Sequence, residues 1–231
     1  MKHLYLIFFS ILFTGPLAMG QSSCSRFYPM QKGTSFEYTN FDKTGKESGS
    51  MNYTIEEASS SGDMTTATMH MTYKDDKGKD VLNSNYTLTC NGNTVHIDYE
   101  SLLSNDMMEQ FHDMDMDITG TDIELPNDLS VGETLADANV QMKMNMSGVN
   151  MNMNIETVNR KVEKKETVTT PAGTFDCFVI SSDTKSKMMM ANNTFPSRQW
   201  LAEGVGMVKQ ETYNKKGKLI GSMLLTQFSQ N

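Results

Sequence analysis

Polar and apolar residues alternate along most of this chain, and short turns rich in Gly, Asp, Asn and Lys interrupt the alternation. Between residues 34 and 98 an apolar side chain recurs at every second position, as in Phe36 and Tyr38 or in Met69 and Met71. A period of two places alternate side chains on opposite faces of an extended strand, which is typical of an antiparallel sheet with one buried face. The sequence therefore predicts an all-β fold, an antiparallel open or closed β-barrel of many hairpin-connected strands.

Two segments depart from this alternation. Apolar residues recur at helical spacing from Leu102 to Phe111, which predicts one amphipathic helix over about 99–112. Residues 122–137, with Pro126 and Gly132, are expected to form an extended loop. Strands are expected again from residue 140 to residue 228, and no Pro-, Gly- or Ser-rich linker divides the chain. We therefore expect a single domain over residues 21–231.

The first 20 residues have the pattern of a secretory signal peptide. Lys2 precedes an apolar run, and Ala18-Met19-Gly20 supplies small residues for cleavage before Gln21. The run is shorter than the ~20 residues that a transmembrane helix needs, so no transmembrane segment is predicted. We expect export to the periplasm or the medium, with a lipid anchor on Cys24 as the alternative.

The charge of the chain excludes some partners. Beyond residue 20 it carries 19 basic and 28 acidic residues. This acidic balance argues against nucleic acid, because phosphate binding needs the opposite sign, and it argues against anionic lipid surfaces as well.

Three cysteines remain in an oxidising compartment, and their spacing fits neither a redox nor a zinc motif. Cys177 lies in an apolar strand, where a free thiol commonly acts as a small buried hydrophobe. Cys24 lies in a terminal segment that needs tethering, and Cys90 precedes a turn. We predict a Cys24–Cys90 disulfide and a free Cys177.

Methionine is unusually abundant, with 21 residues in the chain. A hairpin over residues 142–155 would place its methionines on one face, turned inward like the face that carries Met69 and Met71. This Met-rich face comprises Met69, Met71, Met142, Met144, Met146, Met151 and Met153. It fits plain core, an adaptable wall that binds an apolar ligand, or a Cu(I) site of soft sulfur ligands. No histidine lies in this hairpin, which disfavours copper.

One acidic segment has the spacing of a calcium loop. Asp113, Asp115, Asp117 and Glu124 occupy positions 1, 3, 5 and 12 of an EF-hand pattern. The glycine needed at position 6 is replaced by Ile118, so a strand with solvated aspartates fits better. We predict no metal and no cofactor.

The motifs of enzymes are absent from the sequence. It holds no G-x-S-x-G, H-E-x-x-H or dinucleotide-binding pattern, and His70, His96 and His112 stand outside any known motif. We expect a protein that is not an enzyme.

The chain resembles a family of exported bacterial proteins called TapB-like. The resemblance rests on Cys24-x-x-Phe27-Tyr28-Pro29, on Pro171-Ala172-Gly173-Thr174-Phe175-Asp176-Cys177, and on Trp200-Leu201-Ala202-x-Gly204-Val205-Gly206. It implies a barrel-like all-β exported domain without an established activity, and it transfers no catalytic residue.

These observations favour a non-enzymatic binding or carrier protein that holds an apolar ligand or partner on a Met-rich sheet face. The alternative is a structural or assembly component of the cell envelope that acts through protein contacts. A carrier needs an internal pocket, whereas a scaffold has a filled core and an exposed apolar patch.

Overall fold

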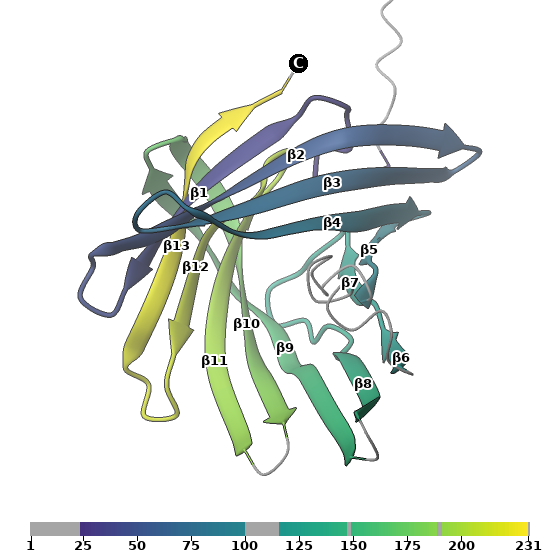
Figure 1. Cartoon of the computed structure of the whole chain (residues 1–231). Helices are drawn as coiled ribbons and strands as arrows, with labels where there is room; N and C mark the ends of the chain where they lie inside the picture. Colours follow the sequence, from purple (N-terminus) through teal and green to yellow (C-terminus); the bar gives the residue numbers. More distant parts are fainter. Residues whose placement is uncertain (1–23, 100–115, 147–148, 189–190, 231) are drawn as a thin grey trace, which may run out of the picture.

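The structure, a computed structural model, describes residues 24–99, 116–146, 149–188 and 191–230, and its thirteen regular elements are all β-strands (Figure 1). In chain order they are β1 (Ser35–Asp42), β2 (Glu47–Ser61), β3 (Met64–Asp75), β4 (Asp80–Asn91), β5 (Thr94–Ile97), β6 (Met116–Thr121), β7 (Ile123–Pro126), β8 (Ala138–Met146), β9 (Val149–Thr170), β10 (Gly173–Met188), β11 (Ala191–Ala202), β12 (Gly206–Tyr213) and β13 (Leu219–Ser229). The all-β prediction is confirmed.

All thirteen strands belong to one sheet, in the order β6-β8-β9-β10-β11-β12-β13-β1-β2-β3-β4-β5-β7, and neighbouring strands are antiparallel. The first and last strands of the chain, β1 and β13, pair in the middle of this order. The sheet curls around an interior to form a nearly closed barrel (Figure 1).

The two edges of the sheet meet at a seam between β6 and β7. These edge strands follow each other in the chain with only Asp122 between them, and β7 also contacts β8. Arg160 of β9 is buried beside this seam, where Nη2 donates to the Glu124 carbonyl of β7 at 2.9 Å and Nη1 donates to the Ala136 carbonyl at 2.6 Å. A short chain link and a buried guanidinium therefore close the barrel where, among the described residues, no ladder of hydrogen bonds joins β6 to β7.

One end of the barrel is closed by residues 24–30, which we call the N-terminal arm. Its Cys24 forms a disulfide with Cys90 at the end of β4, as predicted, with a Cα–Cα distance of 5.8 Å, and Cys177 is free and buried. The buried Asn127 holds the arm further, because its Oδ1 accepts from the Arg26 N–H at 2.8 Å and its Nδ2 donates to the Cys24 carbonyl at 2.7 Å.

The arm also reaches the turn between β11 and β12. The Gly204 N–H donates to the Arg26 carbonyl at 2.9 Å, and Phe27, fully buried, packs edge-on against Phe178 with centroids 5.9 Å apart. Gly206 has φ +89°, and a Cβ there would lie 2.6 Å from the Tyr28 ring. A glycine is therefore required where this ring crosses the start of β12.

The prediction of an extended loop over residues 122–137 was wrong for the first part of this segment. Residues 123–126 pair with β5 as β7, and Pro126 is tolerated because it stands at the end of an edge strand. The helix predicted over about 99–112 lies, except for Tyr99, outside the described residues, as does the predicted signal peptide. The described residues hold no α-helix, and thus no helix long and apolar enough to cross a membrane.

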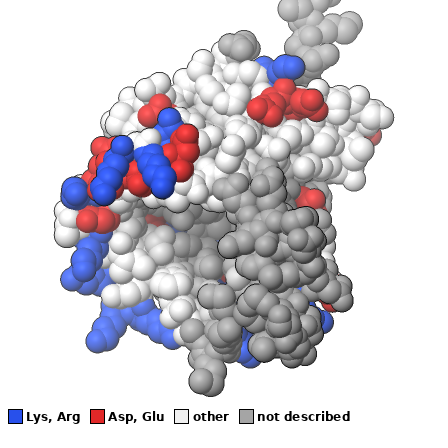
Figure 2. All heavy atoms as spheres, viewed as in Figure 1, with Lys and Arg blue, Asp and Glu red and all other residues white. Residues whose placement is uncertain are grey.

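On the face drawn in Figure 2, many charged side chains gather along one edge. Figure 2 shows lysines together with acidic side chains at the left edge of the view, where the β1–β2 and β3–β4 turns lie in Figure 1, and lysines continue down to the β12–β13 turn. A hollow in the surface lies beside this edge (Figure 2).

Candidate functional site

The barrel interior contains a cavity of about 330 Å³ with a mainly apolar wall. Aromatic side chains form much of the wall: Tyr28, Phe36, Tyr38, Tyr53 and Tyr86. Four methionines add to it: Met51, Met69, Met207 and Met223. Leu88, Ile97, Ile123, Gln199 and Gln210 complete the lining. The cavity is therefore built from strands on both sides of the barrel and from the N-terminal arm.

Strand register explains why these side chains share one face. Residues directly opposite each other in an antiparallel pair point to the same side of the sheet. Tyr38 lies opposite Met51 in β1 and β2, and Met69 lies opposite Tyr86 in β3 and β4. The same rule places Met223 of β13 with Gln210 of β12. Period-two alternation in the sequence is thus converted into one continuous inner surface.

The tyrosines give this surface an ordered aromatic edge. The Tyr38 and Tyr53 rings meet edge-to-face with centroids 5.7 Å apart, and Tyr53 and Tyr86 lie 6.1 Å apart. The Tyr38 hydroxyl donates to the Met207 carbonyl at 2.8 Å, whereas the Tyr53 hydroxyl contacts the Met51 sulfur at 3.7 Å. Since thioether sulfur is a weak acceptor, the Tyr53 hydroxyl retains capacity to donate to a ligand oxygen.

The described wall of the cavity carries no ionised side chain at neutral pH. Burial raises the pKa of Tyr28 to about 12, and burial likewise raises the pKa of Tyr38, Tyr53 and Tyr86 above the ordinary value. The only other polar residues in this lining are Gln199 and Gln210, whose side chains hydrogen-bond to each other at 2.9 Å. An apolar or weakly polar molecule matches this wall, and a bare ion does not.

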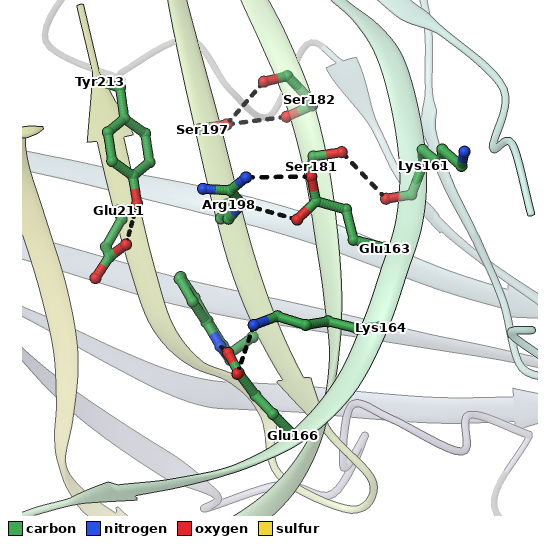
Figure 3. A network of polar contacts seen from close by, with 11 residues as sticks. Lys161, Glu163, Lys164, Glu166, Ser181, Ser182, Ser197, Arg198, Glu211 and Tyr213 are labelled. Carbon is green, nitrogen blue, oxygen red and sulfur yellow. Dashed lines mark hydrogen bonds and ion pairs between the residues drawn. The ribbon is translucent and has the colours of Figure 1, made fainter. Parts of the chain in front are cut away.

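A second set of polar side chains lies across β9 to β12 (Figure 3). Arg198 donates to Glu163, with Nε to Oε2 at 2.7 Å, and Lys164 pairs with Glu166 at 2.6 Å. The Trp200 indole N–H donates to Glu166, and the Lys209 ammonium lies 4.4 Å above the Trp200 ring centroid.

Each of these carboxylates has a cationic partner. The Arg198 hydrogen bond lowers the pKa of Glu163, and the bonds from Lys164 and Trp200 lower the pKa of Glu166. Carboxylates held in their ionised form by neighbouring cations are poor general acids or bases at neutral pH. The network therefore stabilises the pairing of β9 to β12 and the buried Trp200, and it does not form a nucleophile–base arrangement.

The predicted Met-rich face is only partly the cavity wall. Met69 lines the cavity, whereas Met71 and Met142, each 1% exposed, are buried outside its lining. Register places Met142 opposite Met153 and Met144 opposite Met151, so the predicted hairpin pairing is confirmed, and Met142 is buried while Lys143 is exposed. The side chains of Met144, Met146 and Met151 lie outside the described residues, and Met153 is half-buried.

Three methionines that line the cavity were not predicted as site residues: Met51, Met207 and Met223. Met51 stands in a strictly alternating strand with Tyr53, so its inward direction was readable from the pattern. Met207 and Gln210 are three residues apart yet both line the cavity, because the pairing of β11 with β12 shifts register between Trp200 and Leu201. A strict period of two gives no signal for residues on either side of such a bulge.

The acidic segment with EF-hand-like spacing, for which the sequence favoured a strand with solvated aspartates, is a strand in its described part from Met116 to Thr121. Asp117 is an exposed strand residue 3.8 Å from the Lys143 ammonium, and Glu124 lies on β7, 3.8 Å from His96. Asp113 and Asp115 lie outside the described residues. Within the parts of the chain that the structure covers, no group of three His, Cys, Asp or Glu side chains is placed to hold a metal ion.

Fold and cavity together define an all-β, nearly closed barrel with an apolar interior. The chain belongs to the DUF3108-like family, whose model matches residues 31–225. The TapB-like resemblance is not confirmed by this match. No curated protein matches the chain at a significant level.

Two solved structures share the fold. One is a Bacteroides fragilis protein, provisionally described as an exported protein with a YmcC-like fold, with 20% identity, a TM-score of 0.72, and coverage of 90% of this chain and 100% of the other. The second is a Parabacteroides distasonis protein, provisionally described as a lipoprotein, with 22% identity, a TM-score of 0.72, and coverage of 89% and 99%. Both descriptions are consistent with export to the periplasm or the envelope.

Proposed function

We propose that this protein is an exported, non-enzymatic carrier that binds an apolar ligand inside the barrel. The observation that carries the proposal is the cavity of about 330 Å³, walled by aromatic, methionine and aliphatic side chains. Ligand pockets typically measure roughly 300–1,000 Å³ and are mainly apolar with a few placed polar groups. Tyr53 and the Gln199–Gln210 pair supply those groups here.

Methionine suits a carrier of variable apolar ligands. Its side chain is unbranched and polarisable, so four cavity methionines can repack around ligands of different shape. The likeness of the fold to an exported protein and to a lipoprotein supports a place in the periplasm or on an envelope membrane.

The alternative, a structural or assembly component of the envelope, predicts a filled interior and an exposed apolar patch. The large apolar side chains with high exposure among the described residues are Met64 on β3, Val81 on β4, and Val131 in the segment before β8. Met64 lies opposite the end of β4, so it is far along that strand pair from Val81 at the start of β4. This scatter favours the carrier.

Binding of the apolar fluorescent probe N-phenylnaphthylamine tests the proposal. Met223→Trp should fill part of the cavity and weaken probe binding by about tenfold, which equals about 1.4 kcal/mol. Met64→Trp, the same change at an exposed position, is the matched control and should bind as the wild type does.

Thermal unfolding of both variants must match the wild type, so that lost binding is not lost folding. A wild-type protein that leaves the probe unbound, or a Met223→Trp variant that binds it undiminished, would contradict the carrier. Native mass spectrometry of protein from its own host should then reveal a retained ligand that Met223→Trp loses.

A further inference from the structure

Three hairpin turns of this barrel repeat one sequence pattern. Residues 42–46 (DKTGK) join β1 to β2, residues 75–79 (DDKGK) join β3 to β4, and residues 214–218 (NKKGK) join β12 to β13. Each has Asp or Asn first, Gly fourth and Lys fifth. We call these the lysine turns.

Backbone geometry accounts for the first and fourth positions. The side-chain oxygen of the first residue accepts the N–H groups of the third and fifth residues: Asp42 from Thr44 and Lys46, Asp75 from Lys77 and Lys79, and Asn214 from Lys216 and Lys218, all at 2.7–3.0 Å. The fourth residue has φ between 74° and 80°, a left-handed conformation that favours glycine. The lysine side chains take no part in this geometry, so the turn itself does not explain them.

Sheet topology brings the three turns to one end of the barrel. Their strands are consecutive in the order β12-β13-β1-β2-β3-β4, and successive hairpin turns of an antiparallel sheet alternate between its two ends. Asp42 lies opposite Gly221, next to the β12–β13 turn, and Asp75 lies opposite Gly49, next to the β1–β2 turn. The lysines follow one edge of the surface in Figure 2.

The lysine turns are basic on an otherwise acidic protein, although the exposed Glu47 and Asp80 directly follow two of them. The lysine turns contain seven lysines and three aspartates, a net charge of +4, whereas the whole chain has −8. The carboxylates of Asp42 and Asp75 are engaged by turn N–H groups, and Asp76 lies 3.8 Å from Lys46. The other six lysines are exposed and have no ion-pair partner among the described residues.

The lysine turns lie at the end of the barrel opposite the N-terminal arm. The arm contacts the β4–β5 turn, through Cys24 and Gly92, and the β11–β12 turn, through Arg26 and Gly204. Gln210 and Met223, the lining residues of β12 and β13 nearest the lysine turns, extend the cavity wall towards the basic end.

We propose that the lysine turns dock the barrel end-on onto an anionic phospholipid surface. Each Lys near such a surface strengthens partitioning about fivefold. The lysines project from three separate turns, which matches charge spread over a flat surface better than a single small anion. A long polyanion that wrapped the barrel would also meet its acidic sides, whereas a membrane touches one end only. The net charge of the whole chain argues against anionic lipids only because it sums the basic lysine turns with the acidic residues elsewhere.

Co-sedimentation with vesicles tests the proposal. The exported chain should bind vesicles of equimolar phosphatidylglycerol and phosphatidylcholine, should not bind pure phosphatidylcholine, and should be released in about 1 M salt, where the Debye length is about 3 Å. Combining Lys215→Gln, Lys216→Gln and Lys218→Gln should lower the partition coefficient on the order of 100-fold. The three corresponding changes to Arg keep the charge and should keep the binding.

A matched control neutralises three exposed lysines outside the lysine turns, Lys32→Gln, Lys161→Gln and Lys165→Gln, and should keep wild-type partitioning. The docking surface is refuted if the wild type does not bind phosphatidylglycerol vesicles or if both triple Gln variants bind them alike. It is also refuted if the protein binds polyglutamate but not vesicles, since that result would indicate an acidic protein partner. Because Met223→Trp leaves the lysine turns intact, it should dock normally, so failure of the carrier and failure of docking are distinguishable.

Discussion

Arg160→Met tests whether one buried guanidinium holds the barrel seam. Arg160 is 5% exposed and donates to two backbone carbonyls, that of Glu124 on the edge strand β7 and that of Ala136 in the segment before β8. Methionine fills a similar volume and donates no hydrogen bond. Both carbonyls would therefore lose a charged donor in a place where water has little access.

The magnitude follows from the number of lost bonds. A hydrogen bond to a charged group contributes about 1.5–3 kcal/mol, so two bonds give roughly 3–6 kcal/mol. The substitution also removes the cost of burying the guanidinium, the same burial that lowers the pKa of Arg160. We expect a net loss of about 3 kcal/mol in the free energy of unfolding.

Urea denaturation followed by circular dichroism measures this loss, and hydrogen exchange locates it. Amides of β7 should exchange faster, whereas those of β10 and β11 should change only with global stability. Lys161→Met changes the exposed neighbour and should alter stability by less than about 0.5 kcal/mol. Arg160→Lys should be intermediate. If Arg160→Met costs less than about 1 kcal/mol, the seam is held by something other than these two bonds.

Two further predictions concern stability. Replacing Cys24 and Cys90 with serine should lower the free energy of unfolding by about 4 kcal/mol, because the disulfide spans 66 residues. Urea denaturation of the wild type with and without reductant should give the same difference. Cys177 of the native protein should stay unreactive towards Ellman's reagent, because it is buried. Raising the pH should destabilise and unfold the barrel. The pKa of Tyr28 in the folded protein, about 12, lies above the ordinary value of 10.0. The contribution of the neutral Tyr28 to the free energy of unfolding is therefore present below pH 10 and is lost as the pH rises towards 12. The pKa values of Tyr38 and Tyr53 shift in the same direction, and an ultraviolet titration that showed ordinary ionisation of all tyrosines in the folded protein would contradict this.

Local patterns predicted the strands, which depend on nearby residues. The setting of each cysteine predicted the disulfide, although it joins residues with a sequence separation of 66. Alternation from Phe36 to Ile97 indicated the β1–β5 meander, and the turn chemistry indicated its hairpins. The position of Cys90 at a strand end made it a reachable partner for Cys24. Where the phase of alternation is interrupted, as between Met207 and Gln210, the inward side chains could not be assigned from sequence.

Long-range closure was not predictable in the same way. Arg160 and Asn127 are polar residues in polar stretches, and a sequence pattern treats them as solvated. Their burial depends on partners more than 20 residues away, Glu124 for Arg160 and Cys24 for Asn127. Nothing in the spacing of residues 116–126 indicates that two consecutive short strands lie on opposite edges of one sheet.

The N-terminal arm imposes an order of events on a chain that is synthesised from its N-terminus. Residues 24–30 leave the ribosome before all thirteen strands, but their hydrogen-bond partners at Asn127 and Gly204 emerge about 100 residues later or more. The arm therefore cannot complete its native contacts until the β11–β12 turn has been made, although Cys90 and Asn127 are made earlier. Full docking of this early segment therefore cannot precede synthesis of the β11–β12 turn, and the ~10-residue-per-second pace of translation sets the minimum delay before that step.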